Sequence, residues 1–140
     1  MTANPIDLQA ERIVRRASDE LLRIGDGECV VCYLDRMVQI IGCDTTLRFA
    51  RWFRDERAPR ATAIERRFGQ VGGYCDCEVL MNGWSPHPRF WASVREVDAD
   101  GIGIGTDREP PDPPPPCATV RRGSMKPCSN WVRHGCGIEF

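Results

Sequence analysis

The sequence lacks the features that would place the chain in a membrane or outside the cell. No window approaches the ~18 consecutive apolar residues that a membrane helix needs. The first 22 residues carry acids and arginines throughout and include no apolar stretch typical of a signal peptide. We therefore expect a cytoplasmic protein whose thiols stay reduced. The formal net charge of −1 gives no global electrostatic reason to expect a nucleic acid or a membrane as partner.

Lysine, histidine and catalytic motifs are also scarce. Lys126 is the one lysine among 19 basic residues, and there are two histidines. One of these, His87, lies in a rigid proline-flanked turn, where we expect it at the surface or in a hydrogen bond. The sequence has no HExxH, GxSxG or Walker-type motif. These absences favour a protein that is not an enzyme.

Cysteine, in contrast, is abundant, with eight in a chain of 140 residues. A chain of this length can bury enough surface to fold without covalent cross-links. In a reducing compartment, eight cysteines indicate metal ligands or redox groups rather than disulfides.

Hydrophobic periodicity predicts helices in the first half of the chain. In residues 5–24 apolar side chains recur at spacings of three and four, which predicts an amphipathic helix with its apolar residues on one stripe. Three shorter helices are expected over 33–41, 46–57 and 62–68, because Gly42, Pro59 and the Gly-Gly pair at 72–73 interrupt the pattern between and after them.

After that pair the pattern changes to strands. Residues 74–81 alternate in a way that predicts a strand, with Cys75 and Cys77 on one face and Asp76 and Glu78 on the other, solvated face. Further strands are expected over 90–97 and 101–105. The fold class is therefore α+β: N-terminal helices packed on a small antiparallel sheet.

The sequence divides into three regions. Residues 1–106 form the helical plus small-sheet cysteine domain. Residues 107–116 contain six prolines, so this segment is expected to be an extended linker. Residues 117–140 form a basic tail with cysteine and histidine.

The most informative pattern joins a CxxC pair, Cys29 and Cys32, with a CxC pair, Cys75 and Cys77. The first pair lies at a turn entering a helix, where the amides of the first turn favour thiolate. On a strand, the second pair would direct both sulfurs to one side, within the about 3.8 Å that separates two sulfurs on one tetrahedral zinc ion. We predict that these four cysteines hold a structural zinc.

Other cysteines leave alternatives open. Cys43 can replace one of the four ligands or be a small buried hydrophobe. The tail offers a set that is chemically adequate for a second zinc, although it can instead pack back on the domain through its apolar residues. That set comprises Cys117, Cys128, His134 and Cys136.

Arginines recur every three residues along the third predicted helix, at Arg48, Arg51 and Arg54. They form either a solvated face or a contact surface for an acidic protein, RNA or DNA. The first hypothesis is a non-catalytic, zinc-binding interaction module that uses this face to contact a protein partner. The alternatives are a nucleic-acid-binding protein, and a thiol redox or zinc-responsive protein. No membrane partner is expected.

Two segments carry a family resemblance: Gly42-Cys-Asp-Thr-Thr-Leu-Arg-Phe49, and Gly72-Gly-Tyr-Cys-Asp-Cys-Glu-Val-Leu-Met-Asn82. They resemble the uncharacterised bacterial family called domain of unknown function 2695, and the CDCEVL string is the most specific part. The resemblance implies a small bacterial cysteine-bearing protein and brings no assigned activity. It also implies that Cys43, Cys75 and Cys77 form a shared set.

Overall fold

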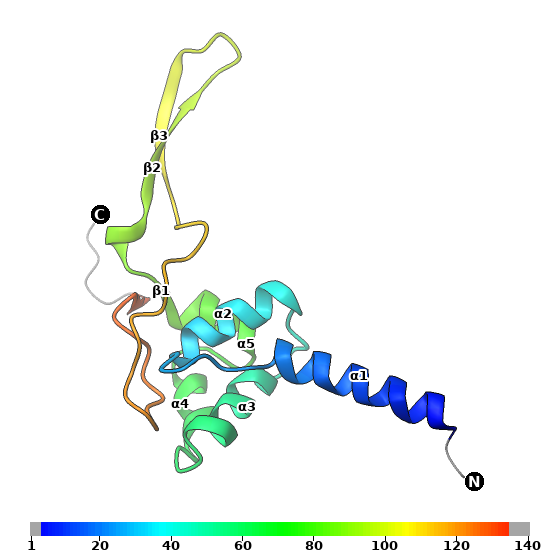
Figure 1. Ribbon diagram of the computed structural model, residues 1–140. Helices are drawn as coiled ribbons and strands as arrows, with labels where there is room; N and C mark the ends of the chain where they lie inside the picture. The colour runs from blue at the N-terminus through cyan, green and yellow to red at the C-terminus, as the bar shows by residue number, and fades with distance from the viewer. Residues whose placement is uncertain (1–3, 135–140) are drawn as a thin grey trace.

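The computed structural model describes residues 4–134, and its architecture is α+β, as the sequence predicts. In chain order the elements are α1 Pro5–Leu21, α2 Val30–Ile40, α3 Arg48–Arg57, α4 Ile64–Gln70, α5 Asp76–Glu78, the π-helical turn η1 Val79–Gly83, β1 Trp84–Pro86, the 3-10 turn η2 Pro88–Phe90, β2 Ala92–Val97, β3 Gly103–Glu109 and β4 Trp131–Arg133. A compact core carries two projecting elements (Figure 1). None of the described helices is both long and apolar enough to cross a membrane.

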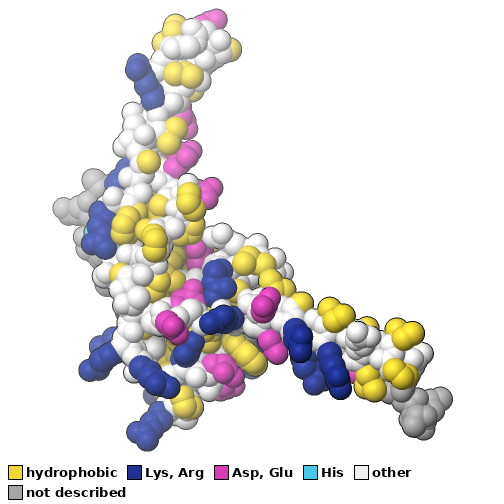
Figure 2. Space-filling model, in the orientation of Figure 1, with side chains coloured by type: hydrophobic (Ala, Val, Ile, Leu, Met, Phe, Trp, Pro, Cys, Tyr) yellow, Lys and Arg dark blue, Asp and Glu magenta, His cyan; other side chains and the backbone are white. Residues whose placement is uncertain are grey.

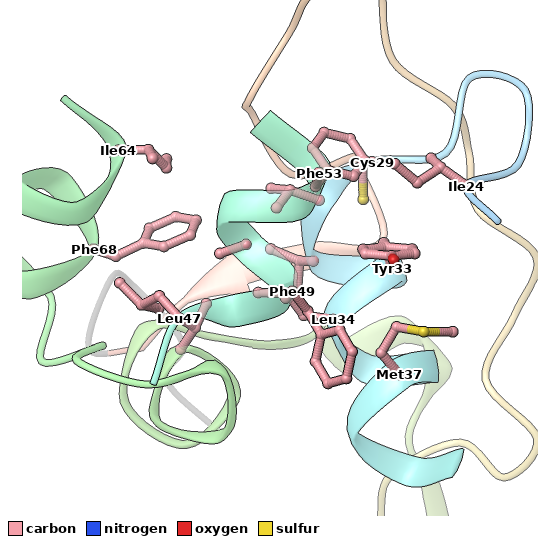
Figure 3. Packing of buried hydrophobic residues seen from close by; sticks show 14 of the residues in the cluster. Ile24, Cys29, Tyr33, Leu34, Met37, Leu47, Phe49, Phe53, Ile64 and Phe68 are labelled. Carbon is pink, nitrogen blue, oxygen red and sulfur yellow. The ribbon is translucent and has the colours of Figure 1, made fainter. Parts of the chain in front are cut away.

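The core forms where α2, α3 and α4 meet, as Figure 3 shows. Helix α2 contributes side chains at helical spacing, including the fully buried Val30, Leu34 and Met37. Phe53 of α3 packs against the Tyr33 ring with 5.7 Å between the ring centroids. The Tyr33 hydroxyl donates to the carbonyl oxygen of Leu22, so even the polar tip of this buried ring has a partner.

Helix α1 projects from the core at the blue end of the ribbon (Figure 1). Asn4 caps it by accepting from the backbone N–H of Ile6, and Pro5 suits the first helical position. The predicted helix is confirmed, but its apolar stripe does not face inward: no residue of α1 is buried, and Ile6 and Val14 are 72% and 65% exposed. The helix ends at Leu21, so the buried Ile24 belongs to the following turn.

Strands β2 and β3 form an antiparallel hairpin that projects in another direction (Figure 1). Ala92 pairs with Glu109 at its base, and a register irregularity lies between Glu96 and Val97. The two predicted strands are confirmed. Strand β3 is longer than expected, however, and takes up residues 107–109, which the sequence assigned to the linker.

The predicted strand over 74–81 is wrong, because this segment folds as α5 followed by η1. The buried residues are Cys75, Asp76, Val79 and Gly83, which recur at helical spacing. In so short a segment the alternating letters of Cys-Asp-Cys-Glu fit a period of two as well as a helical turn. The helical turn is stabilised by contacts of the Asp76 side chain with α3, described below.

The C-terminal segment, residues 117–134, packs back on the core. Its strand β4 pairs antiparallel with β1, with Pro86 opposite Trp131. The backbone N–H of Val120 donates to the carbonyl of Gly27 at 2.9 Å. Val120 and Trp131 are among the partly buried side chains that contact the core. The segment that the sequence describes as a tail is therefore a structural layer of the folded protein.

Candidate metal centres

Four cysteine sulfurs meet where α2 begins. The sulfurs of Cys29, Cys32, Cys117 and Cys128 all lie within 4.8 Å of one another. Cys32 and Cys128 are 96 residues apart in sequence, yet their Sγ atoms are separated by 3.7 Å. This matches the about 3.8 Å expected between two sulfurs on a tetrahedral zinc ion. We call these residues the four-thiol cluster; its sulfurs are positioned to hold a metal ion.

Backbone and indole N–H groups surround the four-thiol cluster. The backbone N–H of Cys32 donates to Cys29 Sγ, and that of Cys29 donates to Cys117 Sγ, each at 3.3 Å. The indole Nε1–H of Trp131 donates to Cys32 Sγ at 3.1 Å. Donors aimed at sulfur favour the thiolate over the thiol, which is the form that binds metals.

The sulfurs of this cluster differ in acidity. The hydrogen bond from the Cys32 thiol lowers the pKa of Cys29 to about 6, despite the opposing effect of burial. The same hydrogen bond raises the pKa of Cys32, and burial raises the pKa of Cys128. Cys29 therefore ionises easily while Cys32 and Cys128 keep their protons. A bound cation is what converts all the sulfurs of such a cluster to thiolates.

A second group, the three-thiol cluster, comprises Cys43, Cys75 and Cys77, whose sulfurs also lie within 4.8 Å of one another. Cys75 and Cys77 are in contact, with 3.3 Å between their Sγ atoms. The Cys75 thiol also donates to Glu78 Oε1 at 3.3 Å. Burial raises the pKa of Cys75 to about 12. Burial also acts to raise the pKa of Cys43, but hydrogen bonds from the backbone N–H groups of Cys77 and Thr45 contribute to a net lowering.

Asp76, which lies between two of these cysteines, fixes the three-thiol cluster against α3. Its side chain is completely buried, and its carboxylate oxygens accept from the backbone N–H groups of Phe49 and Ala50 at 3.0 and 3.1 Å. These are first-turn amides of α3, which have no partner within their own helix. Asp76 therefore caps α3 from a distant segment, and the expectation that it lies on a solvated strand face is wrong. This cap joins the two sequence segments that contain the three cysteines.

Both clusters use the same local turn. Thr45 lies two residues after Cys43, and its backbone N–H donates to that sulfur at 3.4 Å. Thr119 lies two residues after Cys117 and makes the equivalent bond at 3.3 Å. Both threonines have positive φ angles, 71° and 69°. β-branched residues rarely adopt this conformation, and such strain is concentrated at functional sites. The recurrence of the turn supports a shared role for the two clusters.

Gly73 provides the close packing that brings α4 and η1 together beside the three-thiol cluster. A Cβ atom at this position would lie 2.7 Å from Cγ2 of Val79 and 3.2 Å from the Phe68 carbonyl oxygen. No larger residue fits without moving backbone. The close approach accounts for glycine immediately before the Tyr-Cys-Asp-Cys sequence.

The structure groups the cysteines differently from the predicted site. Cys29 and Cys32 were expected to share one ion with Cys75 and Cys77, but the two pairs belong to separate clusters. The first reason is that Cys75 and Cys77 lie on a helical turn anchored to α3, not on a strand. The second is that the C-terminal segment supplies the other two sulfurs near Cys29 and Cys32. Cys43, the alternative ligand, lies with the second pair.

The set predicted in the tail is also divided. Cys117 and Cys128 do come together, but with the α2 cysteines. His134 belongs to neither cluster, and its backbone N–H donates to the Gly83 carbonyl. Cys136 lies outside the described residues. The sequence does contain cysteines on both sides of the proline segment: Cys29 and Cys32 before it, and Cys117 and Cys128 after it. Spacing alone does not say which cysteines meet.

The arginines of α3 make contacts within the chain. The Arg48 guanidinium donates to the Gly42 carbonyl and lies 3.6 Å from the Asp44 carboxylate. Arg54 pairs with Asp55 and, at 3.7 Å, with Glu65. Arg51 is exposed. In Figure 2 basic and acidic side chains alternate over the core. A contact of these arginines with nucleic acid or a partner protein stays a prediction.

Comparison with known proteins identifies relatives of this chain. The profile of the family described as "Protein of unknown function (DUF2695)" matches residues 30–82. The uncharacterised proteins Mb2294 of Mycobacterium bovis and Rv2271 of Mycobacterium tuberculosis are each 40% identical to it over 76 residues, which cover 52% of this chain and 73% of theirs. No solved structure gives a significant match. The profile match includes all of the three-thiol cluster, and the chain belongs to the DUF2695 family.

Proposed function

We propose that the protein is a non-catalytic, zinc-binding interaction module in which the four-thiol cluster holds a structural zinc ion. The observation that carries this proposal is the meeting of four cysteine sulfurs, within 4.8 Å of one another, from two distant parts of the chain. Closed sets of four sulfur ligands are typical of structural zinc sites. Tetrahedral sulfur sites also suit iron, so the identity of the metal is part of the test.

The proposed zinc fastens the C-terminal segment to the start of α2. Cys29 and Cys128 are 0% and 3% exposed, whereas Cys32 and Cys117 are half-buried; four thiolates would leave the ion no position for a substrate. The residues around it also contribute to packing: Cys128 belongs to the hydrophobic core, and Trp131 packs against that core while donating to Cys32 Sγ. This arrangement favours a structural role over a catalytic one, since catalytic zinc ions keep a position open to substrate.

The interaction part of the proposal is supported by the two projecting elements. Most helical stability in proteins comes from packing of an amphipathic face, which α1 lacks within this chain's described residues, and an isolated two-stranded hairpin is marginally stable at best. Figure 2 shows hydrophobic side chains along the projecting α1 helix, and Ile6, Ile13 and Val14 are all more than 60% exposed. We propose that a protein partner with a complementary apolar helix face covers α1.

Metal analysis of the full chain, purified without added metal and without chelator, tests the zinc proposal. Cys117→Ser should contain one zinc equivalent less than the unmodified chain, because three thiolates and a hydroxyl bind zinc more weakly than four thiolates. The matched control is His134→Ala, which changes a described potential ligand that belongs to neither cluster and should keep full zinc. Unchanged zinc in Cys117→Ser would overturn the site, and iron in place of zinc would overturn the assigned metal.

A further inference from the structure

The three-thiol cluster has only part of a metal coordination sphere. In residues 4–134, no histidine, cysteine, aspartate or glutamate side chain joins Cys43, Cys75 and Cys77 as a fourth donor within the same 4.8 Å. Glu78 Oε1 accepts from the thiol of Cys75 at 3.3 Å, but it does not lie within 4.8 Å of all three sulfurs. Zinc sites with three protein ligands keep a fourth position for water or another molecule. This cluster therefore differs in kind from the closed four-thiol cluster.

Several contacts hold the three sulfurs in place. Cys43 accepts from the backbone N–H of Thr45, in a turn with φ 71°. Cys75 and Cys77 flank Asp76, whose carboxylate accepts from the backbone N–H of Phe49 in α3. The backbone N–H of Asp76 donates to the Thr46 carbonyl, just before α3, at 3.1 Å. Ligands fixed by surrounding hydrogen bonds form a preorganised site. The cluster does not need large rearrangement to receive an ion.

The cluster also reaches the surface. Cys43 and Cys77 are half-buried, whereas Cys75 is 5% exposed. The neighbouring Tyr74 is 70% exposed. A molecule from outside the chain can therefore approach the three sulfurs. Cys32 and Cys117 of the four-thiol cluster are also half-buried, but there a fourth sulfur occupies the position that is open in the three-thiol cluster.

Charge limits the kind of molecule that fits. Three thiolates around a divalent zinc ion leave one net negative charge. Two carboxylates lie near this site. Glu78 accepts from the Cys75 thiol, and Asp44 directly follows Cys43 in sequence. The charge of Asp44 is partly balanced by the Arg48 guanidinium, 3.6 Å away. An anionic fourth ligand would add like charge at short range. A neutral nitrogen donor such as imidazole avoids this repulsion and completes a Cys3His set, which is common for zinc.

We propose that Cys43, Cys75 and Cys77 form a second zinc site whose fourth position is open and accepts a neutral nitrogen donor of the imidazole class from outside the chain. This inference goes beyond the structural zinc of the four-thiol cluster. The two can fail separately, because they involve different cysteines.

Cobalt substitution tests the open site in the full chain. Co²⁺ in both clusters absorbs visible light, and its ligand-field bands change when a ligand is exchanged. Imidazole should shift the bands of the unmodified chain in a saturable manner. Cys77→Ser should lose the cobalt bands that shift with imidazole and keep the bands of the four-thiol cluster. Acetate at the same concentration should cause no shift, because an anion is disfavoured.

Two further variants separate an outside ligand from one within the chain. Glu78→Gln and Cys136→Ser should both retain the imidazole response. If bands of the cobalt-loaded protein change in either variant before imidazole is added, that residue occupies the fourth position and the proposal is overturned. Absence of any cobalt signal assignable to Cys77 would also overturn it, while leaving the four-thiol cluster untouched.

A measurement on the unmodified chain covers the case in which Cys77→Ser does not fold. A chromogenic chelator should remove the two zinc equivalents in separate phases, because it can bind at the open position of one site and must displace a thiolate at the other. Imidazole should change the rate of the faster phase alone. A single slow phase, insensitive to imidazole, would contradict an open second site.

Discussion

If zinc fastens the C-terminal segment to the core, removing one thiolate of the four-thiol cluster should release that segment without unfolding the helices. The perturbation is Cys117→Ser, with chelation of metal from the unmodified chain as an independent route to the same state. Because the helices stay folded when the segment is released, the cost of docking it is the entropy of ordering its own backbone, about 1–2 kcal/mol for each residue fixed. A structural zinc site supplies about 10–16 kcal/mol.

Protein contacts also hold the segment, among them the pairing of β4 with β1. They include the Val120–Gly27 and His87–Asn130 backbone bonds, at 2.9 and 2.7 Å, each worth about 0.5–1.5 kcal/mol. Together with the partial burial of Trp131 these contacts offset part of the ordering entropy, and we expect the metal to decide whether the segment stays docked. We expect its opening free energy to fall by at least about 5 kcal/mol, which corresponds to a factor of more than about 10³.

Amide hydrogen exchange measures this opening directly. The backbone N–H groups of Val120 and His87 should lose protection by that factor in Cys117→Ser and in the chelated protein. The N–H of Arg51, which bonds to the Leu47 carbonyl within the core, is the internal reference and should change little. Unchanged protection of Val120 and His87 after loss of metal would refute the reasoning, since the segment would then be held by protein contacts alone.

Three further predictions concern the core and the projecting helix. Asp76→Ala should lower the free energy of unfolding by about 2–4 kcal/mol, because it removes two charge-assisted hydrogen bonds that cap α3. Chemical denaturation measures this change, and a loss under about 0.5 kcal/mol would contradict the capping role. Gly73→Ala should lower the melting temperature, because the added Cβ would clash with Val79 and Phe68. The control Gly105→Ala should not, because a Cβ at Gly105 would have no atom within 4 Å. Equal melting temperatures of the two variants would argue against the close approach at Gly73. Deleting residues 1–21 should leave the zinc content and core stability unchanged, because no residue of α1 is buried; a lower melting temperature would show that α1 packs on the core.

The local elements could be predicted from the sequence because short-range patterns determine them. Apolar spacing located all four longer helices, and the strands expected over 90–97 and 101–105 overlap β2 and β3. The segment around Cys75 could not be predicted in the same way, since both periods fit its few residues. Its helical form depends on the bond between Asp76 and the amides of Phe49 and Ala50, 26 or 27 residues away.

The candidate site was predictable in chemistry but not in grouping. Eight cysteines in a chain without other site motifs indicate metal ligands, and the clusters are positioned to hold metal ions. Which cysteines meet depends on where the C-terminal segment lies, and that is set by long-range contacts such as Val120 with Gly27 and Trp131 with Cys32. The exposed stripe of α1 shows the same limit, because an amphipathic pattern indicates an apolar face without identifying what covers it.

Anomalous diffraction from crystals of the full chain, recorded on both sides of the zinc absorption edge, tests the central claim most directly. A structural zinc at the four-thiol cluster predicts an anomalous peak about 2.3 Å from the sulfurs of Cys29, Cys32, Cys117 and Cys128. A map with no peak between these sulfurs, or with Cys29 and Cys32 sharing a peak with Cys75 and Cys77, would contradict it.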